Sequence, residues 1–345
     1  MPSRGSRIRG CLLGGALGDA LGAPVEFDSW ATIQQRFGPA GITGFSPAYG
    51  RVGAITDDTQ MTLFTAEGLI RARQRWLDRG IANVPSVINR AYMRWLSTQG
   101  HAPPPDPDWI AIETGWLLKQ SFLNCRRAPG TTCLSALQAG GGGTVKRPAN
   151  NSKGCGGVMR VAPIGLVADD AFSLAVQAAA LTHGHPSGFL AAGAFAELIS
   201  HLMTGEPLQS AVQLARDRTN IEPGAAEVTD AIDKAVRVAA SGQVPGVNSI
   251  EELGEGWVAE EALAISIFCA LVAGDVREGL VLAVNHGGDS DSTGSITGNI
   301  LGAMFGEENL PRDLLRDLEG RSVIEQLADD LALDKATDWQ RYPPN

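Results

Sequence analysis

Carboxylates gather at three places where the sequence predicts a helix to begin or end. They lie in Thr56–Thr59, in the segment His286–Gly294, and at Asp19 followed by Glu26. Taken singly, each group could be an ordinary helix cap or a solvated acidic turn, because Asp, Ser and Thr cap helices and acidic side chains suit a helix N-terminus. The segment His286–Gly294 also imitates the start of an EF-hand loop. Ile300 stands where that loop needs a bidentate Glu, which excludes an EF-hand.

Taken together, the three groups are typical of a site for hard divalent cations. All of them offer oxygen donors, and no C-x-x-C pair or H-E-x-x-H motif accompanies them. Oxygen ligands suit Mg²⁺, Mn²⁺ or Ca²⁺ rather than zinc. Two carboxylate pairs at two helix starts could hold two ions ~3.5–4 Å apart. The partial positive charge of each helix N-terminus repels a cation, so such a site would need the full set of carboxylates.

The elements that must position these residues are predicted to be helices. Apolar residues recur at helical spacing in Ala- and Leu-rich segments, while Asn-Gly and Asp-Gly hairpin signals are absent. The helices are predicted at roughly 8–22, 58–79, 86–98, 109–122, 171–183, 188–204, 208–218, 225–240, 258–273, 275–285, 292–305 and 322–332. We therefore expect an all-α fold, a compact multi-helix orthogonal bundle that forms a single domain over residues 1–335. Residues 336–345 are expected to form a polar C-terminal tail.

Two of these helices carry a glycine every four residues. The stripes are Gly10, Gly14, Gly18 and Gly22 in the first helix, and Gly294, Gly298 and Gly302 in the later one. Each helical glycine costs ~1 kcal/mol relative to alanine, but a stripe of them lets a second backbone approach closely. Each stripe adjoins a cluster of carboxylates. We therefore predict that these two helices are central and bring the carboxylates together.

Composition excludes several classes of protein. The 345 residues include 28 basic and 38 acidic ones, a formal net charge of −10, which argues against a broad nucleic-acid surface. No apolar stretch is long enough to span a membrane. The five cysteines are an odd number without metal-site spacing, which predicts free thiols and a cytoplasmic location. The sequence also lacks a G-x-S-x-G elbow and a Walker A loop.

Five segments, taken in order, resemble one known family. The segments are Gly10–Gly22 with Glu26, Thr56–Thr59, Gly156–Pro163, Thr182-His183 and Gly287–Ser292. They are similar to the motifs of the ADP-ribosylglycohydrolases, a family that includes the dinitrogenase reductase-activating glycohydrolase. The resemblance covers about residues 8 to 306. It implies the all-α fold of that family, two Mg²⁺ (or Mn²⁺) ions, and hydrolysis of the bond between C1 of the distal ribose of ADP-ribose and an acceptor.

The resemblance also implies a role for individual residues. It implies that the metal ligands are Thr56, Asp57, Asp58, Asp289, Asp291 and Ser292. It assigns Glu26 to catalysis, and Glu26 or Asp289 could deprotonate the water that attacks C1. It implies that substrate is bound by Ser152, Gly154, Cys155, Gly156, Gly157 and His183. Backbone N–H groups of Gly154–Gly157 could bind the diphosphate without a net positive charge.

Two departures from the family pattern leave the acceptor open. Cys155 stands where relatives often carry Asn. The segment Ala128–Thr131 lacks the Asp that some arginine-type relatives place there. We expect ADP-ribose or an ADP-ribosylated protein as substrate, nucleic acid only as an ADP-ribosylated acceptor, no membrane partner, and a monomer. The alternatives are a hydrolase of O-acetyl-ADP-ribose or ADP-ribose-1-phosphate, or a non-catalytic ADP-ribose-binding protein on the same fold.

Overall fold

Helices make up nearly all of the regular structure in the computed structural model, which describes residues 2–105, 114–335 and 337–344. The helices are α1 (Arg4–Gly22), α2 (Trp30–Phe37), α3 (Asp57–Arg79), α4 (Val84–Thr98), α5 (Thr131–Gln138), α6 (Ala162–Val167), α7 (Ala171–Ala180), α8 (Pro186–Met203), α9 (Leu208–Asn220), α10 (Ala226–Ala239), α11 (Val247–Leu253), α12 (Ala259–Val272), α13 (Val276–Val284), α14 (Ser290–Phe305), α15 (Arg312–Asp317) and α16 (Arg321–Ala332). The predicted all-α fold is confirmed. Among the described residues, no helix is long and apolar enough to cross a bilayer.

The prediction was wrong in one segment, and it missed the short helices α2, α5, α6, α11 and α15. Of the predicted helix at 109–122, residues 109–113 lie outside the described part of the chain. The remainder holds two separate 3₁₀ turns, Leu117–Lys119 and Ser121–Leu123, instead of an α-helix. A two-stranded hairpin was also missed: β1 (Pro47–Ala48) pairs antiparallel with β2 (Arg51–Val52). Its turn residues Tyr49 and Gly50 have φ of 51° and 83°, so Tyr49 occupies a backbone conformation that usually favours Gly or Asn.

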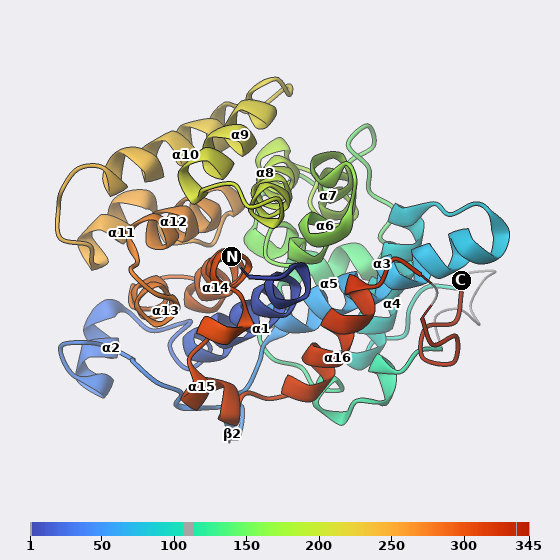
Figure 1. Ribbon diagram of the computed structural model, residues 1–345, viewed down its shortest axis with the longest axis horizontal. Coiled ribbons are helices and arrows are strands. Elements are labelled where there is room, and N and C mark those ends of the chain that lie inside the picture. Colours follow the sequence, from blue (N-terminus) through green and yellow to red (C-terminus); the bar gives the residue numbers. More distant parts are fainter. Residues whose placement is uncertain (1, 106–113, 336, 345) are drawn as a thin grey trace.

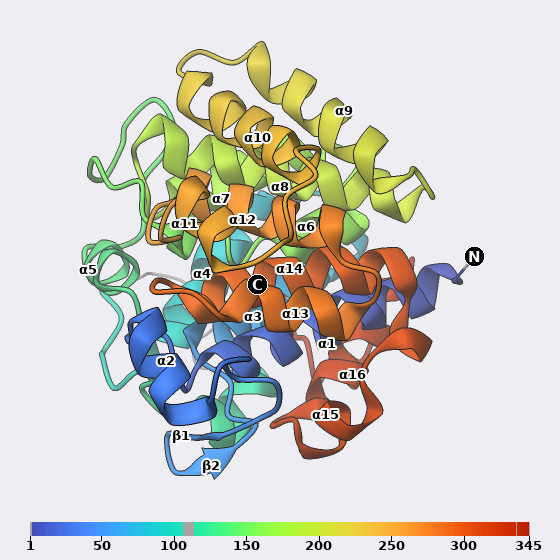
Figure 2. The same ribbon diagram turned by 90° about the vertical axis from the view of Figure 1, so that its left-hand side faces the viewer.

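Helices α1 and α14 form the centre of the molecule, as the glycine stripes predicted. Figures 1 and 2 show the two helices side by side, surrounded by the other helices. A Cβ added at Gly18 would lie 1.9 Å from the carbonyl oxygen of Gly294, and one at Gly14 would lie 2.3 Å from that of Gly298. Because no side chain fits between the two backbones, glycine is required here by close approach. The N-terminal end of α14 therefore lies against the C-terminal end of α1.

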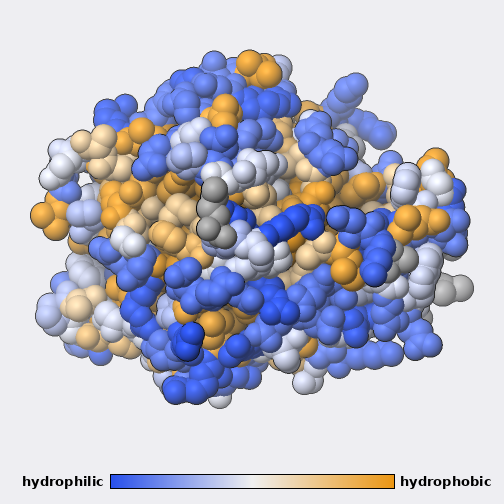
Figure 3. All heavy atoms as spheres, viewed as in Figure 1, coloured by the Kyte–Doolittle hydropathy of each residue, from blue (hydrophilic) through white to orange (hydrophobic). Residues whose placement is uncertain are grey.

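Most side chains of the inner helices are buried. Apolar residues of α1, α3, α8, α12 and α14 belong to one continuous hydrophobic core. Figure 3 shows the outside of the same view, with mostly polar side chains above and below and apolar ones gathered across the middle. The C-terminal segment also contacts the bundle, because the hydroxyl of the buried Tyr342 donates to Asp330 Oδ2 at 2.8 Å. One domain over residues 1–335 with a tail at 336–345 stays a prediction.

Replacing Gly18 with alanine is expected to destabilise the protein by about 3 kcal/mol or more, because the two helices must separate to admit the methyl group. The measurement is the midpoint of urea unfolding. Gly5→Ala is the matched control, because Gly5 lies in the same helix with nothing within 4 Å of an added Cβ. The control should be neutral or slightly stabilising. Equal effects of the two substitutions would contradict the packing argument.

Candidate metal centre and active site

The start of α3 presents Asp57 and Asp58, and a buried carboxylate holds it in place. Asp19 of α1 accepts hydrogen bonds from the backbone N–H of Thr56 at 3.0 Å, from its hydroxyl at 2.8 Å and from the N–H of Thr59 at 3.1 Å. Asp57 Oδ2 accepts from the N–H of Gly130 at 3.2 Å. All of these side chains are buried. Asp19 therefore anchors the helix start, which leaves Asp57 and Asp58 free to face another group.

The start of α14 is built differently from a capped helix. Asp289 stands at its N-cap position but makes no capping hydrogen bond with its side chain. Instead, Asp289 Oδ2 accepts from the thiol of Cys155 at 2.8 Å. Asp291 Oδ1 accepts from the N–H of Ser292 at 2.9 Å, and the Ser292 hydroxyl lies 3.6 Å from the Cys155 sulfur. The capping interpretation of Asp289 is therefore wrong, and its carboxylate is turned toward the other carboxylates.

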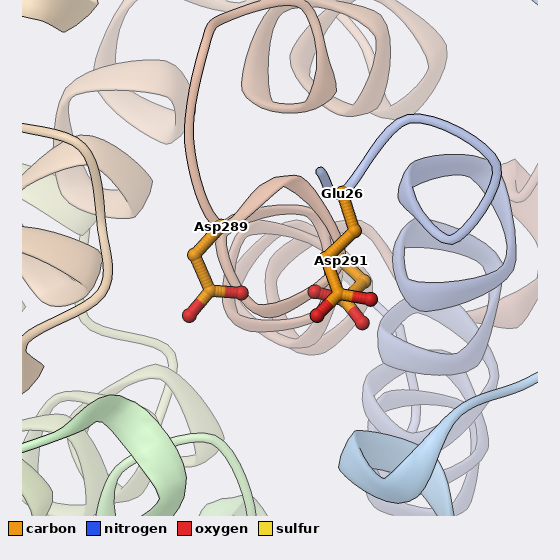
Figure 4. A group of neighbouring side chains, drawn as sticks. All are labelled: Glu26, Asp289 and Asp291. Carbon is orange, nitrogen blue, oxygen red and sulfur yellow. The ribbon is translucent and has the colours of Figure 1, made fainter. Parts of the chain in front are cut away.

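Three carboxylates converge between the end of α1 and the start of α14. One oxygen each of Glu26, Asp289 and Asp291 can be chosen so that all lie within 4.8 Å of one another. Figure 4 shows Glu26 on the turn that follows α1, with its carboxyl group next to that of Asp291. Asp57 and Asp58 lie outside this closest group, but they line the same cavity. The acidic groups predicted at three places in the sequence are thus brought to one site.

Burial and mutual repulsion disfavour the charged form of these acids. Burial, followed by the charge of Asp291, raises the pKa of Glu26 to about 11. The same two causes, in the same order, raise the pKa values of Asp57, Asp58 and Asp289 well above the usual range. The Glu26 Oε2 and Asp58 Oδ1 atoms are buried without a hydrogen-bond partner among the described residues. Hard oxygen donors with unpartnered atoms and excess negative charge fit a divalent cation.

These pKa shifts predict how stability depends on pH. The raised pKa values mean that the folded protein binds more protons than the unfolded chain at neutral pH. The free energy of unfolding in EDTA should therefore fall from pH 5.5 to pH 8, by up to ~1.4 kcal/mol per pH unit for each proton involved. Added Mn²⁺ replaces the protons, so the fall should be smaller with metal. Thermal unfolding at several pH values tests this, and a stability that rises with pH in EDTA would contradict it.

A cavity of about 550 Å³ joins the acidic site to the loop 152–157, the substrate loop, which the sequence predicted to bind substrate. It is lined by Glu26, Asp57, Asp58, Asp289, Asp291, Ser292, Gly154, Cys155, Gly156 and His183, all of which the sequence had singled out. Thr56, Ser152 and Gly157 do not line it. The Ser152 hydroxyl contacts Thr132 Oγ1 at 3.1 Å and accepts from the N–H of Gly154 at 3.3 Å, so it shapes the loop. A separate cavity of about 630 Å³ near Gly141–Arg147 has no carboxylate in its lining.

The substrate loop differs in one respect from the prediction that its backbone N–H groups could all bind diphosphate. The N–H of Gly154 donates to Ser152 Oγ, and that of Cys155 donates to the carbonyl of Trp257 at 3.1 Å. These two donors are already used within the protein.

A Cβ at Gly156 would lie 2.7 Å from the Cys133 sulfur and 3.1 Å from His183 Cε1, so only glycine fits there.

His183 lies in the cavity wall as a neutral ring. It is buried, and its Nδ1 lies 2.8 Å from the hydroxyl of Thr182. Burial, followed by the nearby charge of Arg160, lowers the pKa of His183 to about 3. The ring can accept or donate a hydrogen bond to a ligand at neutral pH, but it carries no charge.

Sequence reasoning missed several residues of the cavity. No motif pointed to Phe27, Arg126, Thr132, Cys133 or Trp257, and Met159 was noted only as part of the segment Gly156–Pro163. Tyr49 does not line the cavity, but burial and the charges of Glu26 and Asp291 raise its pKa. An isolated aromatic or arginine residue in a loop carries no periodic signal. The one available hint was that Phe27 directly follows Glu26.

Comparison with known proteins agrees with this site. The family model described as ADP-ribosylglycohydrolase matches residues 1–341. The chain belongs to the ADP-ribosylglycohydrolase family. It is therefore an ADP-ribosyl hydrolase, an enzyme that cleaves a glycosidic bond.

Two curated relatives and one solved structure place this ADP-ribosylglycohydrolase among known members. It is 24% identical to the ADP-ribosyl-[dinitrogen reductase] glycohydrolase of Rhodospirillum rubrum, over 92% of each chain. It is 26% identical to ADP-ribosylhydrolase ARH3 of Bos taurus, over 94% of this chain and 92% of the relative. A solved structure of an ADP-ribosylglycohydrolase-related protein complex has a TM-score of 0.67 and 26% identity, and covers 95% of this chain and 98% of its own.

Proposed function

We propose that this ADP-ribosylglycohydrolase removes ADP-ribose from modified protein side chains with the help of two Mg²⁺ or Mn²⁺ ions. The observation that carries the proposal is the meeting of Glu26, Asp289 and Asp291, with oxygens within 4.8 Å, at the wall of one cavity. The same cavity reaches Gly154–Gly156 and His183, and we assign the nucleotide diphosphate to this part of it. One cavity therefore offers both a cation site and room for the rest of ADP-ribose.

The metal ligands in this proposal are Thr56, Asp57, Asp58, Asp289, Asp291 and Ser292. The Thr56 hydroxyl donates its proton to Asp19 and accepts from the N–H of Asp58 at 3.4 Å, so its oxygen keeps one lone pair for a cation. We propose two ions because the site has two carboxylate pairs at two helix starts. We propose Mg²⁺ or Mn²⁺ because both ions bind hard oxygen ligands of this kind. When bound, the ions would orient the ribose diol and offset the negative charge of the site.

The protein's own residues supply the proton transfer. Glu26 or Asp289 accepts a proton from the water that attacks C1 of the distal ribose. The carboxylates around C1 stabilise the oxocarbenium-like transition state of glycosidic cleavage. The raised pKa of Glu26 means that it holds its proton at neutral pH until positive charge enters the site. Glu26 is therefore suited to accept a proton only when cations are present in the site.

The test is the release of ADP-ribose from a serine- or arginine-ADP-ribosylated protein, with Mg²⁺, with Mn²⁺ and with EDTA. We expect release from protein that requires metal. Release from O-acetyl-ADP-ribose or ADP-ribose-1-phosphate, with none from protein, would replace the proposal by the small-molecule alternative. Full release in EDTA would contradict the metal.

We also propose that the enzyme works in the cytoplasm as a monomer. All five cysteines are free, which suits a reducing compartment. The net charge of −10 disfavours nucleic acid as a partner, except where it is itself the ADP-ribosylated acceptor. Size-exclusion chromatography with light scattering tests the oligomeric state.

A further inference from the structure

A buried arginine without a carboxylate partner lies behind the wall of the acidic cavity. Arg160 is fully buried, and its guanidinium carbon lies 4.2 Å from the centre of the Tyr92 ring. Its Nη1 atom lies 3.5 Å from the sulfur of Cys133, which lines the cavity, and 3.7 Å from that of Met61. None of the partners of Arg160 among the described residues is a carboxylate. A buried charge is costly unless it is hydrogen-bonded, so its other contacts must offset this cost.

The shortest hydrogen bond of Arg160 goes to Thr182. Its Nη2 atom donates to Thr182 Oγ1 at 2.7 Å and to the carbonyl of Ala178 at 3.2 Å. The second bond satisfies a carbonyl in the last turn of α7, where positive charge is favourable. The bond to Thr182 has a different consequence. A guanidinium group has donors only, so Thr182 Oγ1 must accept there and keeps its own proton for another partner.

The proton of the Thr182 hydroxyl has two partners within reach. His183 Nδ1 lies 2.8 Å from Oγ1, and the carbonyl oxygen of Ala179 lies 3.4 Å from it. Hydroxyl donors form their usual hydrogen bonds at about 2.5–3.0 Å, which favours His183. A proton on Nδ1 would instead leave the hydroxyl proton to the long contact and would turn an N–H group toward the charge of Arg160. Nδ1 therefore accepts, and the proton of the neutral ring lies on Nε2.

The Nε2 atom of His183 faces the substrate loop. A Cβ added at Gly156 would lie 3.4 Å from Nε2, and one added at Gly154 would lie 3.6 Å from it. Both glycines and His183 line the cavity, and no described residue makes a hydrogen bond with Nε2. The N–H groups of Gly154 and Cys155 are already engaged by other groups of the protein. The Nε2–H group therefore supplies a donor where the loop itself has fewer than its sequence suggested.

We propose that Thr182 is a positioning residue: anchored by Arg160, it holds His183 in the Nε2–H form, which donates a hydrogen bond to a phosphate oxygen of the substrate. This inference rests on the proposed function. A phosphate oxygen only accepts hydrogen bonds, so the other ring form would turn a lone pair toward it and repel it. Burial, followed by the charge of Arg160, also lowers the pKa of His183, which keeps the ring neutral.

The first measurement determines the ring form in the full chain, with isotope-labelled histidine. Long-range proton–nitrogen NMR spectra at neutral pH in EDTA distinguish the two ring forms, and His183→Asn identifies the signals of His183. We expect the proton on Nε2 in the wild type. Thr182→Val keeps the shape of the side chain but removes the hydroxyl, so both ring forms should be populated. Thr182→Ser keeps the hydroxyl and should restore the wild-type spectrum.

The second measurement is the affinity for free ADP-ribose. Thr182→Val should weaken binding about tenfold, the loss expected for one hydrogen bond to a charged group, and Thr182→Ser should restore it. The KM of Thr182→Val should rise by a similar factor while kcat stays within about threefold, because the bond holds the substrate before and during the reaction.

Thr219→Val is the matched control for Thr182→Val. Thr219 is also fully buried, its hydroxyl donates to the carbonyl of Ala215 at 2.7 Å, and it does not line the cavity. This variant should match the wild type in spectrum and affinity. Arg160→Met removes the anchor and should populate both ring forms. The Thr182 variants decide the inference if Arg160→Met does not fold.

A wild type with the proton on Nδ1 would overturn the inference, as would a Thr182→Val variant that binds ADP-ribose within about twofold of the wild type. Equal losses of affinity in Thr182→Val and Thr182→Ser would also overturn it, because the hydroxyl would then not be the cause. A folded Arg160→Met variant with the wild-type ring form would overturn the anchoring by Arg160. Failure of the proposed function is distinct: the wild type would show the Nε2–H form, yet it would bind no ADP-ribose and release none from any substrate, and the role of the donor would fall with it.

Discussion

Asp289→Ala is expected to reduce the rate of ADP-ribose release by at least ~10³-fold, because it removes a carboxylate from the centre of the cluster. The loss should come from metal binding as well as from chemistry. Titration of the variant with Mn²⁺ by calorimetry should show weaker binding or fewer ions than the wild type. Asp57→Ala is expected to behave similarly, because Asp57 lines the same cavity at the start of α3.

Asp275→Ala is the matched control for Asp289→Ala. Asp275 also stands at the N-cap of a helix, but it does cap it, since its Oδ1 accepts from the N–H of Glu278 at 2.8 Å. Its replacement should cost ~1 kcal/mol of stability and leave turnover unchanged. Full activity of Asp289→Ala, or equal losses of activity in the two variants, would remove Asp289 from the metal site.

Glu26→Gln is expected to slow hydrolysis by ~10²–10⁴-fold while ADP-ribose still binds. The amide keeps the shape of the side chain but cannot take a proton from water. The neutral amide also removes the cost of keeping this buried carboxyl group protonated at neutral pH, so the protein should be at least as stable as the wild type in EDTA. The measurements are single-turnover release of ADP-ribose, the dissociation constant for ADP-ribose, and thermal unfolding.

Glu325→Gln serves as the control for the change of side chain alone. Glu325 lies on α16 and pairs with Arg321 at 2.7 Å, outside the cavity. That variant should match the wild type in every assay. A Glu26→Gln enzyme with normal turnover would show that another group, such as Asp289, handles the proton. A variant that no longer binds ADP-ribose would instead make Glu26 a binding residue.

The fold was largely predictable because its helices are long and regularly patterned. The segments that became α3, α8, α12 and α14 have apolar residues at helical spacing over many turns, and their observed bounds lie close to the predicted ones. Short helices such as α2, α6 and α15 were missed, because one or two turns give too little periodicity. The 3₁₀ turns at Leu117–Leu123 were taken for a helix on composition, which does not distinguish the two.

The central position of α1 and α14 was predictable for a physical reason that lies in the residues themselves. Glycine every four residues in a helix is unfavourable unless another backbone lies against it. Each stripe therefore predicted the close approach of a second backbone, and the structure shows that the two stripes lie against each other.

The sequence by itself determined the all-α fold, the central pair of helices, the residues that carry oxygen donors, and the family. Local signals suffice for these features, because helical periodicity, glycine spacing and short motifs can each be recognised within a short stretch of sequence. Only the tertiary structure decided that Asp289 is not a cap, that Asp19 anchors the start of α3, and that Gly154 and Cys155 have already used their N–H groups. It alone brought Phe27 against Trp257. These facts depend on contacts between segments far apart in the chain, and burial and orientation at such contacts leave no pattern in either segment alone.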